Sequence, residues 1–365
     1  MLRDRSEPGV DEVLRGSCEL VEEIEIPPVG ASLGARAVNK LRLLAALARG
    51  LPSWAAERSA PDFEARLREV VEQWEPDIVQ LEYRIMGQFL PGLAGVSTPL
   101  VLVDPDPDGP DTSSVLLSPV ERRAWASLGR AVSEQVDSLV AFTERDRRAL
   151  SQLSGKAAVV RIPLAYDVFD RPADPACIST NQIVWVGSFI HPPNVDAVFR
   201  LVRDIFPAVR ARVPDASLDL VGSHATPEVQ SLAGDGVTVY GDVPDVLPYL
   251  DAAAVLAVPV RRGGGMRVKI LEGLAAGKAI VATPLALEGL DLRDGEHVRV
   301  AETDGEFVDA VVDLLTDADA RTRIASAARI WAQRHLDMDA QVRAYEDLYS
   351  SLLRGRSVPD QADRR

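Results

Sequence analysis

The chain has 365 residues, of which 47% are hydrophobic and 26% charged, which suits two soluble domains with apolar cores. Its formal net charge of −15 argues against a nucleic-acid partner, because phosphates would be repelled. No apolar run is long enough to span a bilayer, and two distant cysteines, Cys18 and Cys177, indicate a reducing compartment without a zinc site. We therefore expect a cytoplasmic protein, and leave open peripheral contact with the inner face of the cell membrane through a local basic patch.

The first residues predict a domain that lacks its usual opening unit. Residues 11–17 have a helical pattern and residues 18–26 (CELVEEIEI) predict an edge strand. A nucleotide-binding type of domain usually begins with a buried strand, a glycine loop and a helix, and none precedes this segment. We expect residues 1–170 to form an N-terminally truncated first domain, either because the start codon is assigned too far downstream or because the protein is genuinely shortened.

Strands and amphipathic helices alternate through the rest of the first domain, as in a parallel α/β sheet. The predicted helices are 38–48, 61–74, 86–93, 118–136 and 144–153, and the predicted strands are 76–82, 99–104, 138–142 and 157–162. The loop 104–111 has four acidic residues, which would suit a metal at first sight. Its prolines and flexibility argue against a preorganised metal cage.

The alternation repeats after a proline-rich linker at 171–180 and predicts a second domain at 181–335. Its predicted strands are 183–188, 218–221, 237–240, 255–260, 278–282 and 297–301. Helices are predicted after Pro193 and at 268–275, 304–315, 318–334 and 338–353. Two such series give two doubly wound, Rossmann-like domains facing a cleft. We expect residues 336–353 to cross back to the first domain as a helix, and residues 354–365 to be disordered.

The segment 255–290 reads as strand, glycine loop, helix and strand. The glycine loop 263–265 leads into a helix N-terminus, whose free N–H groups and dipole favour a phosphate. Arg267 and Lys269 add two cations at the helix start, and Glu272 lies one turn further on the same face. A diphosphate at the helix start and a ribose hydroxyl at the carboxylate would make a workable nucleotide site.

A simpler interpretation of the same residues stays open. Three glycines also suit a tight turn without any ligand, and Lys269 with Glu272 could form a solvated ion pair. Short glycine patterns match many unrelated proteins, so the motif alone does not decide between the two interpretations.

The stretch GGGMRVKILEGLAAGKAIVATPLALEGL also resembles the donor-site signature of GT-B glycosyltransferases, in particular the retaining family 4 group. Glu272 matches the second glutamate of that family's Glu-x7-Glu motif, which implies that Glu272 binds the donor ribose. The first glutamate of the motif falls at Gly264. The resemblance is good from about Asp137 to the end of the chain and loose before it.

This resemblance implies a GT-B enzyme that transfers a sugar from a nucleoside diphosphate with retention at the anomeric carbon. Arg267 and Lys269 would be the catalytic cations, because the departing diphosphate gains negative charge. With such a cation pair we expect no metal and no other cofactor. The acceptor would be a glycan, a lipid or a small molecule that the sequence does not identify.

Other donor-binding residues follow from two further stretches that resemble the family. GSFIHPPNVDAV matches a turn that faces the donor, although this chain has Ser188 there and no lysine. VYGDVP matches a stretch whose backbone packs on the nucleobase. All four histidines follow residue 190, so the first domain has no histidine for the transferred sugar. The expected donor-binding set is Gly187, Ser188, His191, Asp242, Val243, Gly264, Gly265, Met266 and Glu272.

Two other functions remain as alternatives. A sugar-nucleotide epimerase of the same fold would need ionisable groups around the sugar, and no such set is evident. A degenerate protein that binds a nucleotide-sugar without turnover is favoured by Gly264, by the missing histidine and by the expected truncation.

Overall fold

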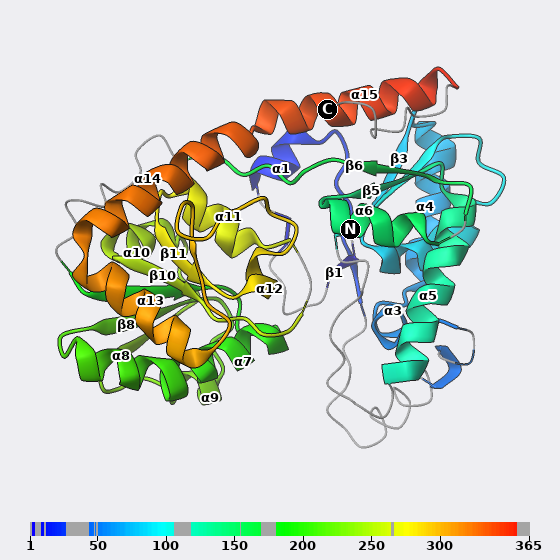
Figure 1. Ribbon diagram of the computed structural model, residues 1–365. Coiled ribbons are helices and arrows are strands. Elements are labelled where there is room, and N and C mark those ends of the chain that lie inside the picture. Colours follow the sequence, from blue (N-terminus) through cyan, green and yellow to red (C-terminus); the bar gives the residue numbers. More distant parts are fainter. Residues whose placement is uncertain are drawn as a thin grey trace. The chain divides into compact units, whose positions relative to one another are not determined.

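The computed structural model of the protein describes residues 2–3, 9–10, 12–26, 44–46, 48, 50–105, 118–153, 155–168, 180–263 and 266–355. Its internal contacts divide the chain into two compact units. Unit 1 comprises Met1–Ile162 with Tyr345–Arg365, and unit 2 comprises Pro163–Ala344. Each unit has a parallel sheet with helices packed against it (Figure 1). No helix in the described part of the chain is both long and apolar enough to cross a membrane.

Unit 1 contains a four-stranded parallel sheet in the order β3-β4-β5-β6. Its strands are β3 (Val79–Glu82), β4 (Leu100–Val103), β5 (Ser138–Ala141) and β6 (Ala158–Arg161). A separate parallel pair joins β1 (Leu2–Arg3) to β2 (Ile24–Glu25). The helices are α1 (Glu12–Ser17), α3 (Ser53–Glu57), α4 (Pro61–Trp74), η1 (Arg84–Leu93), α5 (Ser118–Gln135) and α6 (Glu144–Ser151).

Most of the predicted elements of unit 1 are present, and α4 has the predicted bounds. The predicted edge strand 18–26 is wrong over most of its length, because only Ile24–Glu25 pairs with another strand. Glu22 instead forms an ion pair with Arg66 of α4. The segment predicted as a helix at 86–93 is a 3-10 helix that contains Pro91, which lacks the N–H needed for an α-helical bond. The expected loss of an opening unit stays a prediction.

A buried ion pair connects the start of η1 to the end of β4. Arg84 and Asp104 are 4% and 2% exposed, and Arg84 Nε donates to Asp104 Oδ2 at 2.6 Å. The guanidinium also lies 5.9 Å from the ring of Trp125 in α5. The first acid of the predicted 104–111 loop therefore has a structural partner, and the rest of that loop lies outside the described residues.

Unit 2 contains a six-stranded parallel sheet in the order β12-β11-β10-β7-β8-β9. The strands are β7 (Gln182–Val186), β8 (Ser217–Gly222), β9 (Val237–Gly241), β10 (Val255–Val258), β11 (Ala279–Ala282) and β12 (Arg299–Val300). The first helices are α7 (Pro192–Arg200), the π-helical turn η3 (Leu201–Ile205), α8 (Phe206–Arg212), α9 (Pro227–Gln230) and α10 (Leu247–Ala252). The remaining helices are α11 (Val268–Ala275), α12 (Pro284–Leu287), α13 (Asp304–Thr316), α14 (Ala318–His335) and α15 (Met338–Leu353), which continues into unit 1.

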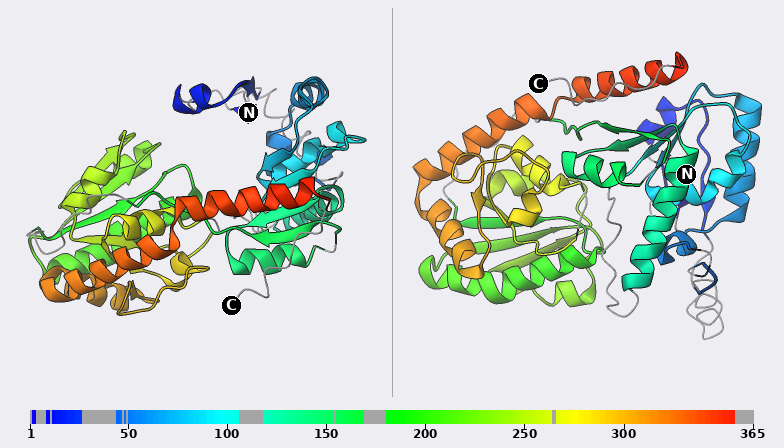
Figure 2. Two further views of the ribbon diagram at one scale, coloured as in Figure 1. Left: turned by 90° about the horizontal axis from the view of Figure 1, so that it is seen from above. Right: turned by 45° about the vertical axis from the view of Figure 1, so that its right-hand side comes forward.

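Helices cover both faces of this sheet (Figure 2). Helices α7, α8 and α13 pack on one face, around Trp185 and Leu220. Helices α10 and α11 pack on the other face, around Val184 and Leu256. Strands buried on both faces must be apolar along their whole length, which explains the uninterrupted runs in the sequence. The strand order starts in the middle at β7 and runs outward in both directions, as in a doubly wound domain.

Two glycines allow the ends of β7 and β8 to approach closely. Gly187 has φ +150°, a conformation that side-chain-bearing residues rarely adopt. A Cβ added to Gly222 would lie 1.8 Å from the carbonyl oxygen of Gly187. The backbone of Gly222 in turn accepts a hydrogen bond of 2.6 Å from the N–H of Asp242. Gly222 therefore fixes the loops that follow three neighbouring strands.

We expect Gly222→Ala to lower the free energy of unfolding by about 1–3 kcal/mol, because the new methyl group would push the Gly187 backbone away. Gly305→Ala is the matched control, since a Cβ there would meet nothing within 4 Å. That control should be neutral or stabilising by about 0.5–1 kcal/mol. Urea unfolding of both variants measures the difference, and equal stabilities would contradict this account of Gly222.

Candidate functional site

The sheet order of unit 2 marks one place for a ligand. Strands β7 and β10 are neighbours, and the chain continues from them toward opposite edges of the sheet. In open parallel sheets the crevice beyond the carboxyl ends of such strands is where ligands bind. The loops that leave this point are 187–191 after β7 and 259–267 after β10. Most of the site residues predicted from the sequence lie in these two loops and the elements that they join.

The loop after β7 is closed by Asn194. Its side-chain amide donates to the carbonyl of Ser188 at 2.8 Å. A Cβ on Gly187 would lie 3.3 Å from that same amide nitrogen and 3.3 Å from Lys269 Cε. The turn at Gly187 is therefore packed directly against Asn194 and Lys269. The predicted residues Gly187 and Ser188 and the predicted cation Lys269 are brought together here.

Lys269 is held among side chains that restrict its position. Its Nζ donates to Asn194 Oδ1 at 2.5 Å and lies 5.0 Å from the centre of the Trp185 ring. Burial, and to a lesser extent the charge of Arg267, lowers the pKa of Lys269 to about 8. A desolvated cation with one neutral hydrogen-bond partner has unused capacity to bind an anion.

Glu272 lies one turn further along α11 and accepts a hydrogen bond of 2.8 Å from the hydroxyl of Tyr166. Burial raises the pKa of Glu272, and the nearby carboxylate of Asp245 adds to that increase. The Tyr166 hydrogen bond acts in the opposite direction, because it favours the ionised carboxylate. Within the described residues Lys269 and Glu272 form no ion pair with each other, so the alternative of a solvated pair is wrong.

Tyr166 belongs to the segment 163–168, which follows the last residue of unit 1. The N–H of Tyr166 donates to the carbonyl of Leu336 at 3.4 Å. The side-chain amide of Gln341 donates to the carbonyl of Pro163 at 2.9 Å. Three hydrogen bonds, including the one to Glu272, thus hold this segment on unit 2.

Arg267 differs from its expected place in the first turn of α11. It is the residue before the helix, with φ +55°, and its backbone carbonyl accepts the first helical hydrogen bonds. Its side chain is 7% exposed and its Nη2 lies 3.2 Å from Glu288 Oε2. Arg267 is therefore a buried, paired cation whose field acts on Lys269.

The two other arginines of the glycine loop each form an ion pair beside the site. Arg261 pairs with Asp304 and Arg262 pairs with Asp196, each at 2.8 Å. Gly263 has φ +92°, and a Cβ there would lie 2.7 Å from Pro193 at the start of α7. Met266 is partly buried, whereas Gly264 and Gly265 lie outside the described residues.

The remaining predicted residues line the ends of β7 to β9. His191 is the residue before α7, and partial burial with the charges of Lys269 and His224 lowers its pKa. Asp242 has φ +53° and accepts a hydrogen bond of 2.8 Å from the N–H of His224. Val243 packs on the apolar cluster beneath α10 and α11. The Asp242 carboxylate therefore connects the loop after β9 to the loop after β8.

The sequence did not identify three residues that complete this arrangement: Tyr166, Trp185 and Asn194. Asn194 falls at the start of the helix predicted after Pro193, and Trp185 falls in the predicted strand 183–188. Each makes its contact with a residue of α11, at a separation of 75 residues for Asn194 and 106 for Tyr166. Tyr166 lies within the predicted first domain, 1–170, so no sequence signal connected it with Glu272. Among the described residues no group of three or more His, Cys, Asp or Glu is placed to hold a metal ion.

Comparisons with known proteins found relatives of the second unit and of the whole fold. Residues 180–317 match the family model described as glycosyl transferases group 1. A phosphatidyl-myo-inositol mannosyltransferase of Mycobacterium tuberculosis is 26% identical over 222 residues, which cover 56% of this chain and 57% of that protein. The chain spans about half the length of the curated relatives that it matches, between 46% and 57%.

Solved structures extend the similarity to most of the chain. A sucrose-phosphate synthase from Thermosynechococcus elongatus has a TM-score of 0.67 and 18% identity, with 81% of this chain and 78% of that chain covered. The Anabaena protein HepE in complex with UDP and glucose also has a TM-score of 0.67, with 17% identity and coverage of 96% and 91%. The fold is GT-B. The predicted fold of two parallel α/β domains is confirmed.

The lowered pKa of Lys269 can be measured directly. Burial also lowers the pKa of Lys278 to about 8. We therefore expect NMR titration of the lysine ε-methylene groups to show two resonances with midpoints near 8, of which only the Lys269 resonance is absent from the spectrum of Lys269→Met. Because the folded pKa lies below the unfolded value of 10.5, the contribution of Lys269 to stability should rise as the pH increases from 8 to 10.5. A midpoint near 10.5 for this resonance would show that Lys269 is solvated.

Proposed function

We propose that this protein is a glycosyltransferase that moves a sugar from a nucleoside diphosphate to an acceptor, with retention at the anomeric carbon. The supporting observation is that α11 presents a desolvated cation and a half-buried carboxylate one turn apart, at the switch point of the unit 2 sheet. The match of residues 180–317 to glycosyl transferases group 1 and the UDP complex of HepE support the same class of reaction.

In this proposal the diphosphate binds beside Lys269 and the N-terminus of α11. Asn194 orients the ammonium group, and Trp185 keeps water from one side of it. Arg267 contributes a second positive charge from its buried position against Glu288. As the bond to the sugar breaks, negative charge grows on the diphosphate, and fixed cations in a dry site stabilise that charge strongly. Arg267 and Lys269 are thus the proposed catalytic cations.

Glu272 is the proposed ligand of the donor ribose. Tyr166 bonds to Oε1 of the carboxylate, which leaves Oε2 to accept from a ribose hydroxyl. The backbone around Asp242 and Val243 would then pack on the nucleobase. Gly187, Ser188 and His191 lie beside Lys269 and would contact the diphosphate or the transferred sugar. We assign Gly264, Gly265 and Met266 to the diphosphate by their place in the sequence.

Because two cations and a helix N-terminus already oppose the charge of the diphosphate, we propose transfer that needs no metal ion and no cofactor. Activity should therefore survive a metal chelator. The acceptor is a glycan, a lipid or a small molecule, and nucleic acid is not a partner. A lipid acceptor would bring the protein to a membrane surface.

Binding without turnover is the second candidate function. Gly264 occupies the position of the first motif glutamate, and Arg267 is already paired with Glu288. Both features weaken the assignment of chemistry near the transferred sugar, but neither bears on the proposed positions of the ribose and the diphosphate. This candidate predicts tight donor binding with neither hydrolysis nor transfer.

Tyr166 should position Glu272 for the ribose. We expect Tyr166→Phe to weaken nucleoside diphosphate binding about three- to tenfold, as for the loss of one hydrogen bond of about 0.5–1.5 kcal/mol. Analogues that lack the 2′- or 3′-hydroxyl should lose less affinity in the variant, because they use Glu272 less. Calorimetric titration measures this, with Tyr249→Phe in the same unit as the matched control. Equal losses for ribose and deoxyribose ligands would contradict this role.

The proposed function is tested in two steps. A thermal-shift screen of nucleoside-diphosphate sugars identifies the donor, and transfer to candidate acceptors is then followed with that donor. Lys269→Met should reduce the transfer rate by tenfold or more, since a charge-assisted contact to the leaving group is lost. Release of an isomerised nucleotide-sugar without acceptor would identify an epimerase. Donor binding without any turnover would identify the second candidate.

A further inference from the structure

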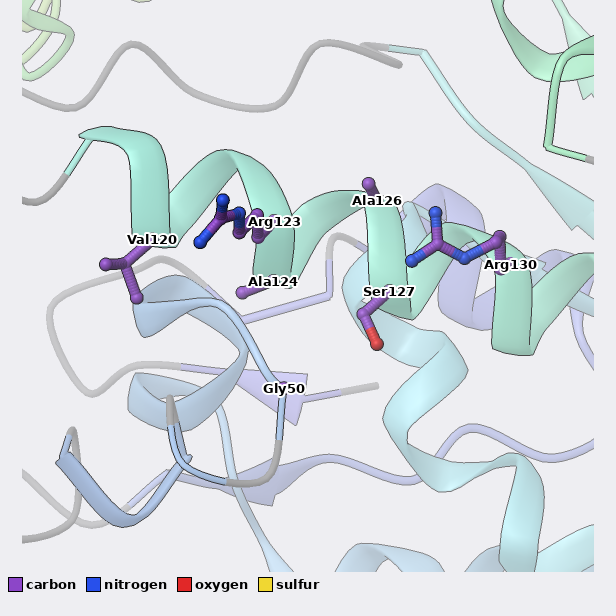
Figure 3. A pocket seen from close by; sticks show the side chains of 7 residues that line it. All are labelled: Gly50, Val120, Arg123, Ala124, Ala126, Ser127 and Arg130. Atoms are coloured by element: carbon purple, nitrogen blue, oxygen red, sulfur yellow. The ribbon is translucent and has the colours of Figure 1, made fainter.

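Unit 1 has a hollow on the surface of α5 that none of the functions above uses. Its volume is about 540 Å³. It lies between one face of α5 and the turn at Gly50 (Figure 3). The lining residues are Gly50, Val120, Arg123, Ala124, Ala126, Ser127 and Arg130.

The polar residues of this hollow share one face of the helix. Arg123, Ser127 and Arg130 follow each other at intervals of four and three residues, which places them on adjacent turns of one face. The two arginines are about 10 Å apart along the helix axis at 1.5 Å per residue. Figure 3 shows both guanidinium groups extending toward the Val120 end of α5. The opposite face packs into the core through Trp125, Leu128 and Val132.

Within the described residues, neither arginine has an acidic partner. No ion pair or hydrogen bond joins the side chain of Arg123 or Arg130 to any residue in the described part of the chain, whereas Arg147 and Arg148 of α6 both pair with Glu144. This arrangement occurs in a chain with a net charge of −15. Acids are thus abundant, but none of them binds these two guanidinium groups among the described residues.

The turn at Gly50 closes the side of the hollow. Gly50 has φ +77°, and a Cβ there would lie 3.1 Å from the hydroxyl oxygen of Ser127. The N–H of Leu51 donates to the carbonyl of Ala46, which holds this turn in place. A side chain at position 50 would fill the space beside Ser127, so glycine keeps the hydroxyl accessible.

We propose that this hollow binds a phosphate group, with Arg123 and Arg130 as charge partners and Ser127 as a hydrogen-bond donor. Guanidinium groups match phosphate oxygens in geometry, and their charge does not depend on pH in the physiological range. The apolar side chains of Val120 and Ala124 would contact the organic part of the ligand. The assignment of this phosphate to the acceptor rests on the proposed function. If that function holds, the acceptor carries the phosphate, either as a soluble phosphate monoester or as a lipid headgroup.

Phosphate binding can be tested independently of sugar transfer. Equilibrium dialysis with labelled inorganic phosphate and glycerol 3-phosphate at low salt gives the affinity and the number of sites. The Lys269→Met background removes the proposed diphosphate site of unit 2. In that background we expect one remaining site, weakened about tenfold by Arg123→Gln or Arg130→Gln and a hundredfold or more by both together.

The matched control is Arg122→Gln, which removes the same charge from the neighbouring position of α5 but outside the hollow. Phosphate binding should be unchanged in this control variant. In both the control and the parent protein, phosphate binding should weaken as salt is added. It should also weaken below about pH 6, where a phosphate monoester loses its second negative charge. Gly50→Val should also block binding. Equal effects of Arg122→Gln and Arg123→Gln, or no phosphate bound in the Lys269→Met background, would overturn the proposal for soluble ligands.

Vesicles distinguish the two sources of the phosphate. Phosphatidylcholine vesicles with and without phosphatidic acid are sedimented with each variant. Binding that requires phosphatidic acid and is lost in the Arg123→Gln/Arg130→Gln variant, but not in Arg122→Gln, identifies a lipid headgroup. If neither soluble phosphates nor these vesicles bind, the inference is wrong. Transfer activity on an acceptor without phosphate would leave the proposed function intact and refute only the assignment to the acceptor.

Discussion

The close approach of Gly187 and Gly222 is the constraint on which the unit 2 site depends. Because Gly222 has only a hydrogen atom in place of a side chain, the carbonyl of Gly187 after β7 can lie against the backbone at the end of β8. This brings the loop after β7 within reach of Asn194 and the loop after β9 within reach of the Gly222 carbonyl. A side chain at Gly222 would push the Gly187 backbone away, and Gly187 packs directly against Asn194 and Lys269.

Lys269 shows how stability and binding oppose each other in this site. Burial makes its positive charge unfavourable in the free protein, which is why its pKa is lowered to about 8. Its contacts with Asn194 and the Trp185 ring offset only part of the lost hydration. In the proposed function, an anion bound at Lys269 would relieve this penalty, and part of the stability that the fold loses would be recovered as affinity for the ligand.

Much of the fold could be predicted because it depends on local patterns. Uninterrupted apolar runs identify the strands of unit 2, and the helix after Pro61 was predicted with its observed bounds. The 18–26 segment was mispredicted because its alternating pattern has no neighbouring strand over most of its length. In the site, the spacing of Lys269 and Glu272 was visible in the sequence, and their assigned roles stay predictions.

The partners of these side chains could not be predicted. The contacts of Asn194 and Tyr166 with α11 join residues 75 and 106 positions apart, and no periodic pattern encodes such pairs. The pairing of Arg267 with Glu288 was missed for the same reason.

The hydrogen bond from Tyr166 has a consequence for the whole chain. The carboxylate that we assign to the donor ribose also accepts one of the hydrogen bonds that attach the segment following unit 1. Binding and attachment therefore share one group, and thermodynamic linkage requires each to respond to the other. A ligand that binds Glu272 and leaves its hydrogen bond to Tyr166 intact would stabilise the attachment of this segment. A ligand that moves the carboxylate away from Tyr166 would weaken that attachment. If a nucleoside binds at Glu272 as proposed, its effect on this hydrogen bond would therefore reach the peptide that follows unit 1.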